Sequence, residues 1–188
     1  IAGLPPLPID QLLDMLLGVN VYALLNRLQV DFVFTNDYII RPRTRYLTIR
    51  TTVVTAPPGS GKTMLVPAAV LDDLPSDQSV VLLQPRRLAA RSVAHQIARL
   101  RGCDLGGEVG YQVRFDSRTS RATRLFVETT GIMLRRLLTD IALDGIGAVV
   151  LDEFHERTVE MDLVLGLLVR LRQTVRPDLR VIVMSATL

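Results

Sequence analysis

The alternation of short apolar runs with longer helical stretches constrains the fold of this chain more than any other feature of its sequence. Five runs rich in β-branched and other apolar residues are separated by segments with helical periodicity; they are Val53–Thr55, Val80–Leu83, Leu125–Glu128, Ala148–Leu151 and Val181–Met184. Runs without polar alternation, such as Val80–Leu83, are typical of strands covered on both faces. The sequence therefore predicts an α/β domain of three layers, in which helices flank a central, mainly parallel sheet.

The stretches between these runs predict the helices. They are Thr63–Leu71, Leu88–Leu100, Ile132–Leu138 and Val159–Leu171. Residues 1–50 differ in character: Leu4–Pro8 is proline-rich, Asp10 is placed to cap a helix through Leu17, and Phe32–Arg50 mixes strand-like residues with arginines. We therefore divide the chain into an N-terminal helical or irregular segment, residues 1–50, and an α/β domain, residues 51–188.

Composition restricts the classes of protein further. The chain has 188 residues, of which 48% are hydrophobic, so it can bury one core. Its 22 basic and 19 acidic residues give a net charge of only +3, so any surface that binds a polyanion must be a local patch. Cys103 is the only cysteine, which excludes an internal disulfide and agrees with a reducing cytoplasm. The apolar runs are too short to span a bilayer, so we expect no membrane partner.

A glycine-rich segment lies between the first strand and the first helix of the α/β domain. It reads Ala56-Pro57-Pro58-Gly59-Ser60-Gly61-Lys62-Thr63. Glycines allow the backbone to wrap around phosphate oxygens, and the following helix N-terminus favours anions. We assign nucleotide binding, with ATP as the ligand, to Pro58, Gly59, Ser60, Gly61, Lys62 and Thr63. An ordinary glycine turn is the alternative, and the strand before it makes that alternative weak.

Two residues of this segment carry chemistry. Lys62, which we expect to be exposed in the loop, would reach the β- and γ-phosphates as a point charge, and the Thr63 hydroxyl would bind Mg²⁺. A second motif, Asp152-Glu153-Phe154-His155, follows the strand Ala148–Leu151. Asp152 is expected to hold Mg²⁺, and Glu153 to deprotonate the attacking water. Either acid alone would read as a helix cap, so the pairing of the two motifs supports the catalytic assignment, which includes His155.

Taken together, these motifs resemble a known family. Asp152-Glu153-Phe154-His155-Glu156-Arg157, Gln84–Arg91 and Ser185-Ala186-Thr187 resemble the DEAH/DExH group of superfamily 2 helicases, and Phe154 is similar to HrpB-type bacterial proteins. Gly110–Phe115 and Thr129–Arg135 look like further blocks of the same family, in the family's order. In HrpB-like sequences a segment such as Leu7–Asp10 leads almost directly into the first strand, so residues 19–50 look like an insertion or a replaced segment.

The resemblance implies roles that spacing alone does not show. It implies a RecA-like domain of a P-loop NTPase, an ATP-dependent helicase with Mg²⁺ as cofactor and single-stranded RNA or DNA as partner. The resemblance implies that Pro85, Arg86, Arg87, Thr129, Thr130 and Gly131 contact the nucleic-acid strand. It also implies that Ser185, Ala186 and Thr187 couple the ATP state to movement of that strand. We expect the grip to be on the backbone, with Tyr111 and Phe115 as the only stacking candidates in these blocks.

Alternatives remain at this point. The chain reads as a piece of a longer protein whose second RecA-like domain, with its arginine fingers, is absent. A nucleotide- and nucleic-acid-binding module without turnover of its own would use the same residues, and a P-loop kinase or small-molecule ATPase is a third option. Backbone contacts do not distinguish RNA from DNA.

Overall fold

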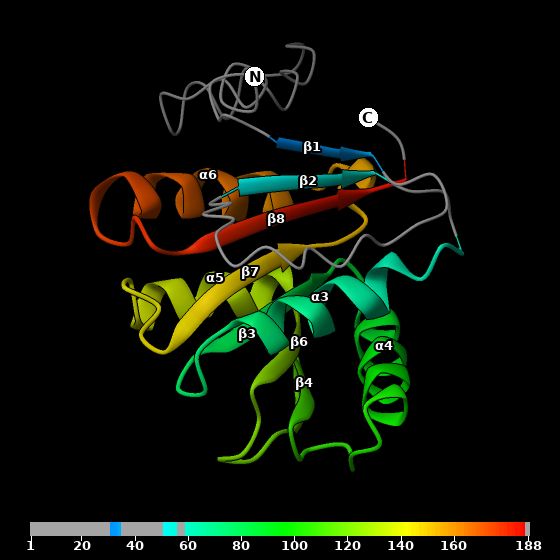
Figure 1. Ribbon diagram of the computed structural model, residues 1–188. Coiled ribbons are helices and arrows are strands. Elements are labelled where there is room, and N and C mark those ends of the chain that lie inside the picture. Colours follow the sequence, from blue (N-terminus) through cyan, green and yellow to red (C-terminus); the bar gives the residue numbers. More distant parts are fainter. Residues whose placement is uncertain (1–30, 35–50, 56–58, 187–188) are drawn as a thin grey trace, which may run out of the picture.

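The computed structural model describes residues 31–34, 51–55 and 59–186, which form a sheet between two layers of helices (Figure 1). The strands are β1 (Asp31–Phe34), β2 (Thr51–Thr55), β3 (Ser79–Gln84), β4 (Val109–Val113), β5 (Asp116–Arg118), β6 (Leu125–Thr129), β7 (Ile146–Leu151) and β8 (Arg180–Ser185). Their order in the sheet is β1-β2-β8-β7-β3-β6-β4-β5. All neighbouring pairs are parallel except the antiparallel hairpin β4–β5. This confirms the predicted three-layer α/β architecture with a mainly parallel sheet.

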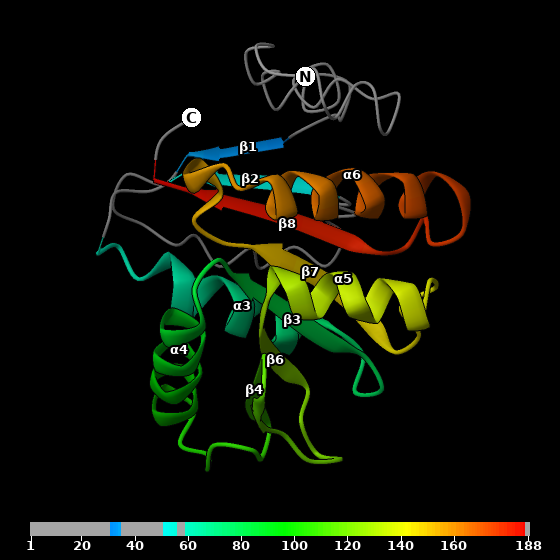
Figure 2. The ribbon, with the colours of Figure 1, turned by 180° about the vertical axis from the view of Figure 1, so that it is seen from behind.

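The helices divide between the two faces of the sheet. Helices α3 (Lys62–Asp73) and α4 (Arg87–Leu100) cover one face, whereas α5 (Thr130–Thr139) and α6 (Val159–Thr174) cover the other, as the two opposite views show (Figures 1 and 2). Alternate residues of β3 serve the two faces: Val80 and Leu82 pack with α3 and α4, and Val81 and Leu83 with α5 and α6. Burial on both faces explains why these strands lack polar alternation.

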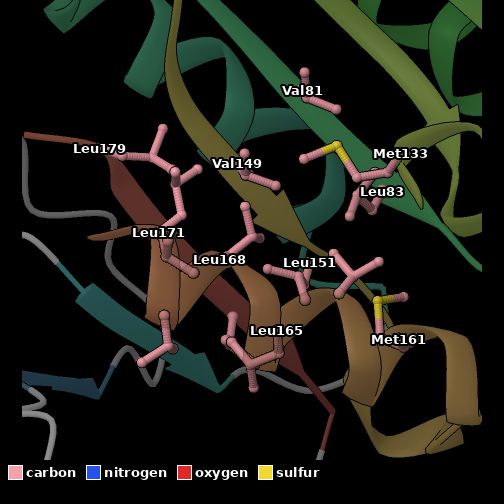
Figure 3. Packing of buried hydrophobic residues seen from close by; sticks show 14 of the residues in the cluster. Val81, Leu83, Met133, Val149, Leu151, Met161, Leu165, Leu168, Leu171 and Leu179 are labelled. Atoms are coloured by element: carbon pink, nitrogen blue, oxygen red, sulfur yellow. The ribbon is translucent and has the colours of Figure 1, made fainter. Parts of the chain in front are cut away.

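The core between the sheet and α6 shows how this packing is made. Leu165 and Leu168 of α6 lie against Val149 and Leu151 of β7, and all four side chains are fully buried (Figure 3). Burial of a leucine side chain stabilises the fold by about 1.5–3 kcal/mol. The apolar stripe of the predicted helix Val159–Leu171 is therefore core, as expected.

The structure also contains elements that the sequence did not predict. The hairpin β4–β5 was missed because Gly110 interrupts its apolar pattern; a Cβ at this position would overlap the carbonyl oxygen of Arg118, so only glycine fits there. A short 3₁₀ turn, η1 (Phe154–Glu156), follows the acidic residues. Strand β1 lies within residues 1–50 and pairs in parallel with β2, which adds it to the sheet of the predicted α/β domain. The predicted helix Asp10–Leu17 lies outside the described residues.

Candidate functional site

The motifs singled out in the sequence meet along one edge of the sheet. Because β2, β8, β7, β3 and β6 are parallel neighbours, their carboxyl ends lie side by side (Figure 1). Thr55, the last residue of β2, is in register with Ser185, and Gln84 is in register with Thr129. The order along the edge is therefore the phosphate loop, Ser185 and Ala186, the acidic motif, Pro85–Arg87, and Thr129–Gly131. The predicted nucleotide residues lie at one end of this row and the predicted strand contacts at the other.

The described end of the phosphate loop has the backbone that such a loop requires. Gly59 and Gly61 adopt φ angles of 81° and 82°, in the left-handed region that favours glycine. Gly61 also begins α3, because its carbonyl accepts hydrogen bonds from the N–H groups of Met64 and Leu65, both at 3.0 Å. The first turn of α3 carries no acidic side chain, so nothing there competes with an anionic ligand. Pro58 lies outside the described residues.

Lys62 differs from its expected environment. It is the first residue of α3 and is only 7% exposed, although we expected an exposed loop cation. The residue belongs to α3, a helix that packs against β3 and α4, and not to the loop before it. A cation in the first turn of a helix adds to the positive field of the backbone N–H groups there, which makes an anionic ligand more favourable at this position.

Asp152 is the most deeply buried acid of the site. Its side chain has no exposed surface, and its oxygens accept hydrogen bonds from the Gln84 side-chain amide at 2.7 Å and from the Glu153 backbone N–H at 2.9 Å. Both donors are neutral, so they orient the carboxylate without cancelling its charge, and each oxygen keeps a lone pair. A buried carboxylate in this state suits a cation, and carboxylate and hydroxyl oxygens such as those of Asp152 and Thr63 are ligands of the kind that Mg²⁺ takes.

Glu153 and His155 are placed by a strained turn. Glu153 has a φ of 52°, and the bend aims its side chain beside His155, whose Nε2 lies 3.3 Å from Glu153 Oε2. The other ring nitrogen, Nδ1, accepts a 3.4 Å hydrogen bond from the backbone N–H of Ala186. A neutral imidazole that accepts at Nδ1 carries its proton at Nε2, the nitrogen that faces Glu153. His155 thus bridges the predicted base and the predicted coupling motif. Thr187 lies outside the described residues.

A partly buried ion pair fixes the chain just after this turn. Arg157, with a φ of 45°, places Nη2 3.1 Å from Asp162 Oδ2, and its guanidinium also lies 5.5 Å from the centre of the Phe154 ring. Asp162 is fully buried in α6, and this burial raises its pKa in spite of Arg157. Thr158 caps α6 by accepting a hydrogen bond from the Met161 N–H at 3.2 Å. The acidic motif is therefore anchored to α6 at its C-terminal side.

The residues predicted to contact the nucleic-acid strand differ in accessibility. Arg86 and Arg87 are exposed, and the Arg86 side chain retains 73% of its surface. Thr129 and Thr130 are buried, and the Thr130 hydroxyl donates a 2.9 Å hydrogen bond to Glu160. Gly131 is exposed in the first turn of α5. The arginine side chains and the backbone near Gly131 are thus the groups of these two blocks that a ligand can reach.

A hollow next to these blocks was not predicted. It has a volume of about 300 Å³ and is lined by Gln112–Ser117 of the β4–β5 hairpin together with Ile132 and Arg135 of α5. Phe115, at the hairpin tip, is 89% exposed, and the Arg114 guanidinium lies 4.7 Å from its ring centre. Tyr111 is only 6% exposed and donates a hydrogen bond to Asp116, so it offers no stacking surface. Asp116 also pairs with Arg91, which gives Arg91 a structural partner.

Sequence reasoning also missed the role of Gln84. The residue was recognised as part of a motif, but its bond to Asp152 joins strands that are 68 residues apart in sequence. The available signal was an amide at the carboxyl end of a predicted buried strand, the same edge of the sheet at which the acidic motif was expected. Among the described residues no group of three or more His, Cys, Asp or Glu could hold a metal by itself. In the same part of the chain, no helix has the length and apolarity needed to cross a membrane.

The fold and the edge residues define a class. A mainly parallel sheet with a glycine loop, lysine and threonine after one strand, and a buried and a partly exposed carboxylate after a second strand, is the nucleotide-binding domain of the P-loop ATPases. Residues 42–188 match the family described as DEAD/DEAH box helicase, and the chain belongs to that family.

Individual relatives agree with this membership. The chain is 48% identical over 140 residues to a probable ATP-dependent RNA helicase, DHR2, of Saccharomyces cerevisiae, covering 73% of this chain and 19% of the relative. It is 43% identical over 136 residues to the ATP-dependent RNA helicase HrpB of Escherichia coli, covering 72% and 17%. A crystal structure of the Escherichia coli DEAH/RHA helicase HrpB superposes with a TM-score of 0.70 at 42% identity, covering 74% of this chain and 18% of that one. The chain thus spans less than a fifth of the length of each of these relatives, and the RecA-like fold is confirmed.

Proposed function

We propose that this chain is the ATP-binding domain of an ATP-dependent helicase, which couples hydrolysis to movement on single-stranded nucleic acid. The observation that carries the proposal is the order of motifs along the carboxyl edge, with the nucleotide residues at one end and accessible arginines at the other. Family membership supports the same conclusion. The relatives are named as RNA helicases, which favours RNA over DNA as the strand.

The nucleotide end performs the chemistry in this proposal. The backbone at Gly59–Gly61, together with Lys62, would hold the phosphates, and Thr63 and Asp152 would hold Mg²⁺, which would supply positive charge to neutralise the developing negative charge. Glu153 takes the proton from the attacking water. Its contact with His155 keeps the carboxylate oriented, because the imidazole is itself held by the Ala186 backbone.

The end of the site that we propose binds the nucleic-acid strand provides contacts that do not depend on base sequence. Arg86 and Arg87 at the start of α4, and the exposed backbone around Gly131, are donors suited to phosphate oxygens. Phe115 at the rim of the hairpin hollow adds one aromatic ring that a base can stack on. Most of the binding energy should therefore be electrostatic and sensitive to salt.

A second RecA-like domain completes the proposed enzyme. In related phosphoryl-transfer enzymes an added arginine is worth about 10³–10⁵ in rate, which corresponds to roughly 4–7 kcal/mol of barrier. Arg157 is the arginine nearest in sequence to the acidic motif, and Asp162 and Phe154 already hold it. We therefore propose that the activating arginine comes from another domain. The single cysteine agrees with a reducing cytoplasm as the place of action.

The test is steady-state ATP hydrolysis with and without polyuridylate or polythymidylate. We expect the chain of residues 1–188 to bind nucleotide weakly and to show almost no stimulation, whereas a chain extended through the next domain should be stimulated. Asp152→Asn in the extended chain is the control for contaminating ATPase. Strong stimulation of the short chain contradicts the two-domain mechanism. Hydrolysis in the extended chain that ignores the strand favours a small-molecule ATPase, and strand binding without hydrolysis favours a binding module.

A further inference from the structure

The segment after the acidic motif contacts both blocks that we propose bind the strand. Arg86 Nη2 lies 3.1 Å from Glu156 Oε1, and the Thr130 hydroxyl donates its 2.9 Å hydrogen bond to Glu160 Oε2. Glu156 ends the turn η1, and Glu160 lies in the first turn of α6. Two carboxylates only four positions apart therefore connect the segment after the acidic motif to the starts of two helices, α4 and α5.

The two contacts differ in how easily they can be exchanged. Thr130 is only 3% exposed, so solutes cannot readily reach its hydroxyl and replace its hydrogen bond to Glu160. The Arg86 and Glu156 side chains are 73% and 30% exposed, so water and solutes reach this pair. Exposed ion pairs contribute little to stability, whereas a phosphate accepts bidentate, charge-assisted hydrogen bonds from arginine. A strand phosphate can therefore displace Glu156 from Arg86 at small cost.

We propose that Glu156 is a positioning residue that occupies Arg86 until a strand phosphate replaces it, and that this exchange links strand binding to the acidic motif. The inference rests on the proposed function, because it requires Arg86 to bind the strand. Glu156 is an internal substitute for the phosphate, so its charge opposes strand binding. When Glu156 is released, the ion pair with Arg86 no longer holds the last residue of the turn η1.

The geometry of η1 makes such a change local to the hydrolytic residues. The Glu156 N–H donates a 2.9 Å hydrogen bond to the Glu153 carbonyl, and His155, between them, contacts both Glu153 and Ala186. On the other side, Arg157 is held by Asp162 of α6. With its C-terminal side anchored, movement of Glu156 is transmitted toward Glu153 and His155 rather than toward α6.

A double-mutant cycle tests the exchange in the chain of residues 1–188. The variants are Glu156→Gln, Arg86→Ala and the two together, and the probe is a fluorescein-labelled oligouridylate followed by anisotropy at low salt. Asp77→Asn is the matched control, because it removes the same charge at an exposed site before β3, at the opposite edge of the sheet. We expect Glu156→Gln to tighten binding up to about fivefold, the range of an exposed ion pair. This gain should disappear in the Arg86→Ala background and be absent in Asp77→Asn.

A second measurement distinguishes a positioning role of Glu156 from a general effect of its negative charge. Because binding linkage is reciprocal, a strand whose binding is coupled to the acidic motif should change the affinity of the unaltered chain for a fluorescent Mg-nucleotide. In Glu156→Gln, the ratio of the nucleotide affinities with and without the strand should move toward one. Glu156→Ala should act in the same direction. Circular dichroism checks that each variant is folded, and loss of the fold in both Glu156 variants would make its role structural and overturn the proposal.

The remaining outcomes distinguish failure of the Arg86–Glu156 exchange from failure of the proposed strand-binding face. If the unaltered chain binds the oligonucleotide and Arg86→Ala weakens it, but Glu156→Gln binds equally or less tightly, the exchange is overturned and the proposed function stands. An unchanged gain in the Arg86→Ala background also overturns the exchange. If the unaltered chain does not bind, or Arg86→Ala has no effect, the assignment of the strand face fails and the exchange fails with it.

Discussion

The side-chain amide of Gln84 donates a 2.7 Å hydrogen bond to Asp152, a carboxylate with no exposed surface. The bond joins the carboxyl ends of β3 and β7, which are neighbours in the sheet. It connects the residue before the predicted strand contacts to the residue predicted to hold Mg²⁺. A single buried contact thus spans the boundary between the two halves of the site.

Replacing Gln84 should therefore affect both stability and metal-nucleotide binding. Gln84→Leu leaves one oxygen of a buried carboxylate without its donor, which costs about 1–3 kcal/mol of unfolding free energy, while the other oxygen keeps its bond from the Glu153 N–H. Mg-nucleotide affinity should fall as well, because Asp152 loses its orientation. Urea unfolding and calorimetry measure the two effects, with the exposed Gln173→Leu as control. Unchanged stability would show that water satisfies Asp152 equally well.

Lys62→Ala should weaken Mg-ATP binding while leaving the fold intact. Loss of a charge-assisted hydrogen bond corresponds to about 1.5–3 kcal/mol, or roughly ten- to a hundredfold in affinity. The free energy of unfolding should change by less than about 1 kcal/mol, because a cation at a helix N-terminus is itself unfavourable. Calorimetry with Mg-ATP decides the point, and exposed Arg99→Ala controls for net charge. Equal affinity in Lys62→Ala and the unaltered chain contradicts the phosphate role.

Glu153→Gln in the extended, two-domain protein should retain ATP binding and lose hydrolysis by about a hundredfold or more, the usual scale for a positioned base. The amide keeps the shape of the side chain and can still contact His155, so binding is preserved. Single-turnover hydrolysis and nucleotide titration separate the two steps. Turnover at the normal rate would remove Glu153 from the mechanism.

Replacing both Arg86 and Arg87 by Ala should weaken single-strand binding equally for unrelated sequences. Each lost phosphate contact lowers the dependence on salt, so the log–log slope should flatten by roughly one to two units. The control is Arg99→Ala with Arg121→Ala, two exposed arginines away from the carboxyl edge. Anisotropy over a salt series gives both quantities, and an effect restricted to one sequence is incompatible with backbone contact.

The stability of the fold should depend on pH through Glu128. This residue is fully buried beside Arg136, and burial raises its pKa above the ordinary value of 4.5. The folded state therefore binds the proton more tightly than the unfolded state, so the contribution of Glu128 to stability is present at low pH and is lost as pH rises through the raised pKa. Asp162, whose pKa burial also raises, acts in the same direction.

Glu128→Gln isolates this contribution. The stability of the unaltered chain relative to Glu128→Gln should fall as pH rises from about 4.5, with a slope of up to about 1.4 kcal/mol per pH unit. Urea unfolding across the pH range measures it, and Asp77→Asn serves as the exposed control. A relative stability that rises with pH would show that Arg136 outweighs the cost of burial.

The sequence alone determined the elements whose signals are local. Strands β2, β3, β6, β7 and β8 and helices α3 to α6 were predicted because their apolar residues recur at strand or helix spacing. The phosphate loop was visible because Gly59 and Gly61 must adopt positive φ angles between a strand and a helix. The assignment of roles to the site residues remains a prediction from these motifs and from the family.

Only the tertiary structure decided which motifs touch. Sequence spacing does not encode strand order, so the bonds from Gln84 to Asp152 and from Ala186 to His155, and the pair Arg86 with Glu156, appear only once β8, β7 and β3 lie side by side. Burial is decided in the same way: Lys62 and Thr130 have polar side chains, yet both are buried in the folded chain. A side chain's environment depends on residues far away in the chain, and the local pattern carries no record of them.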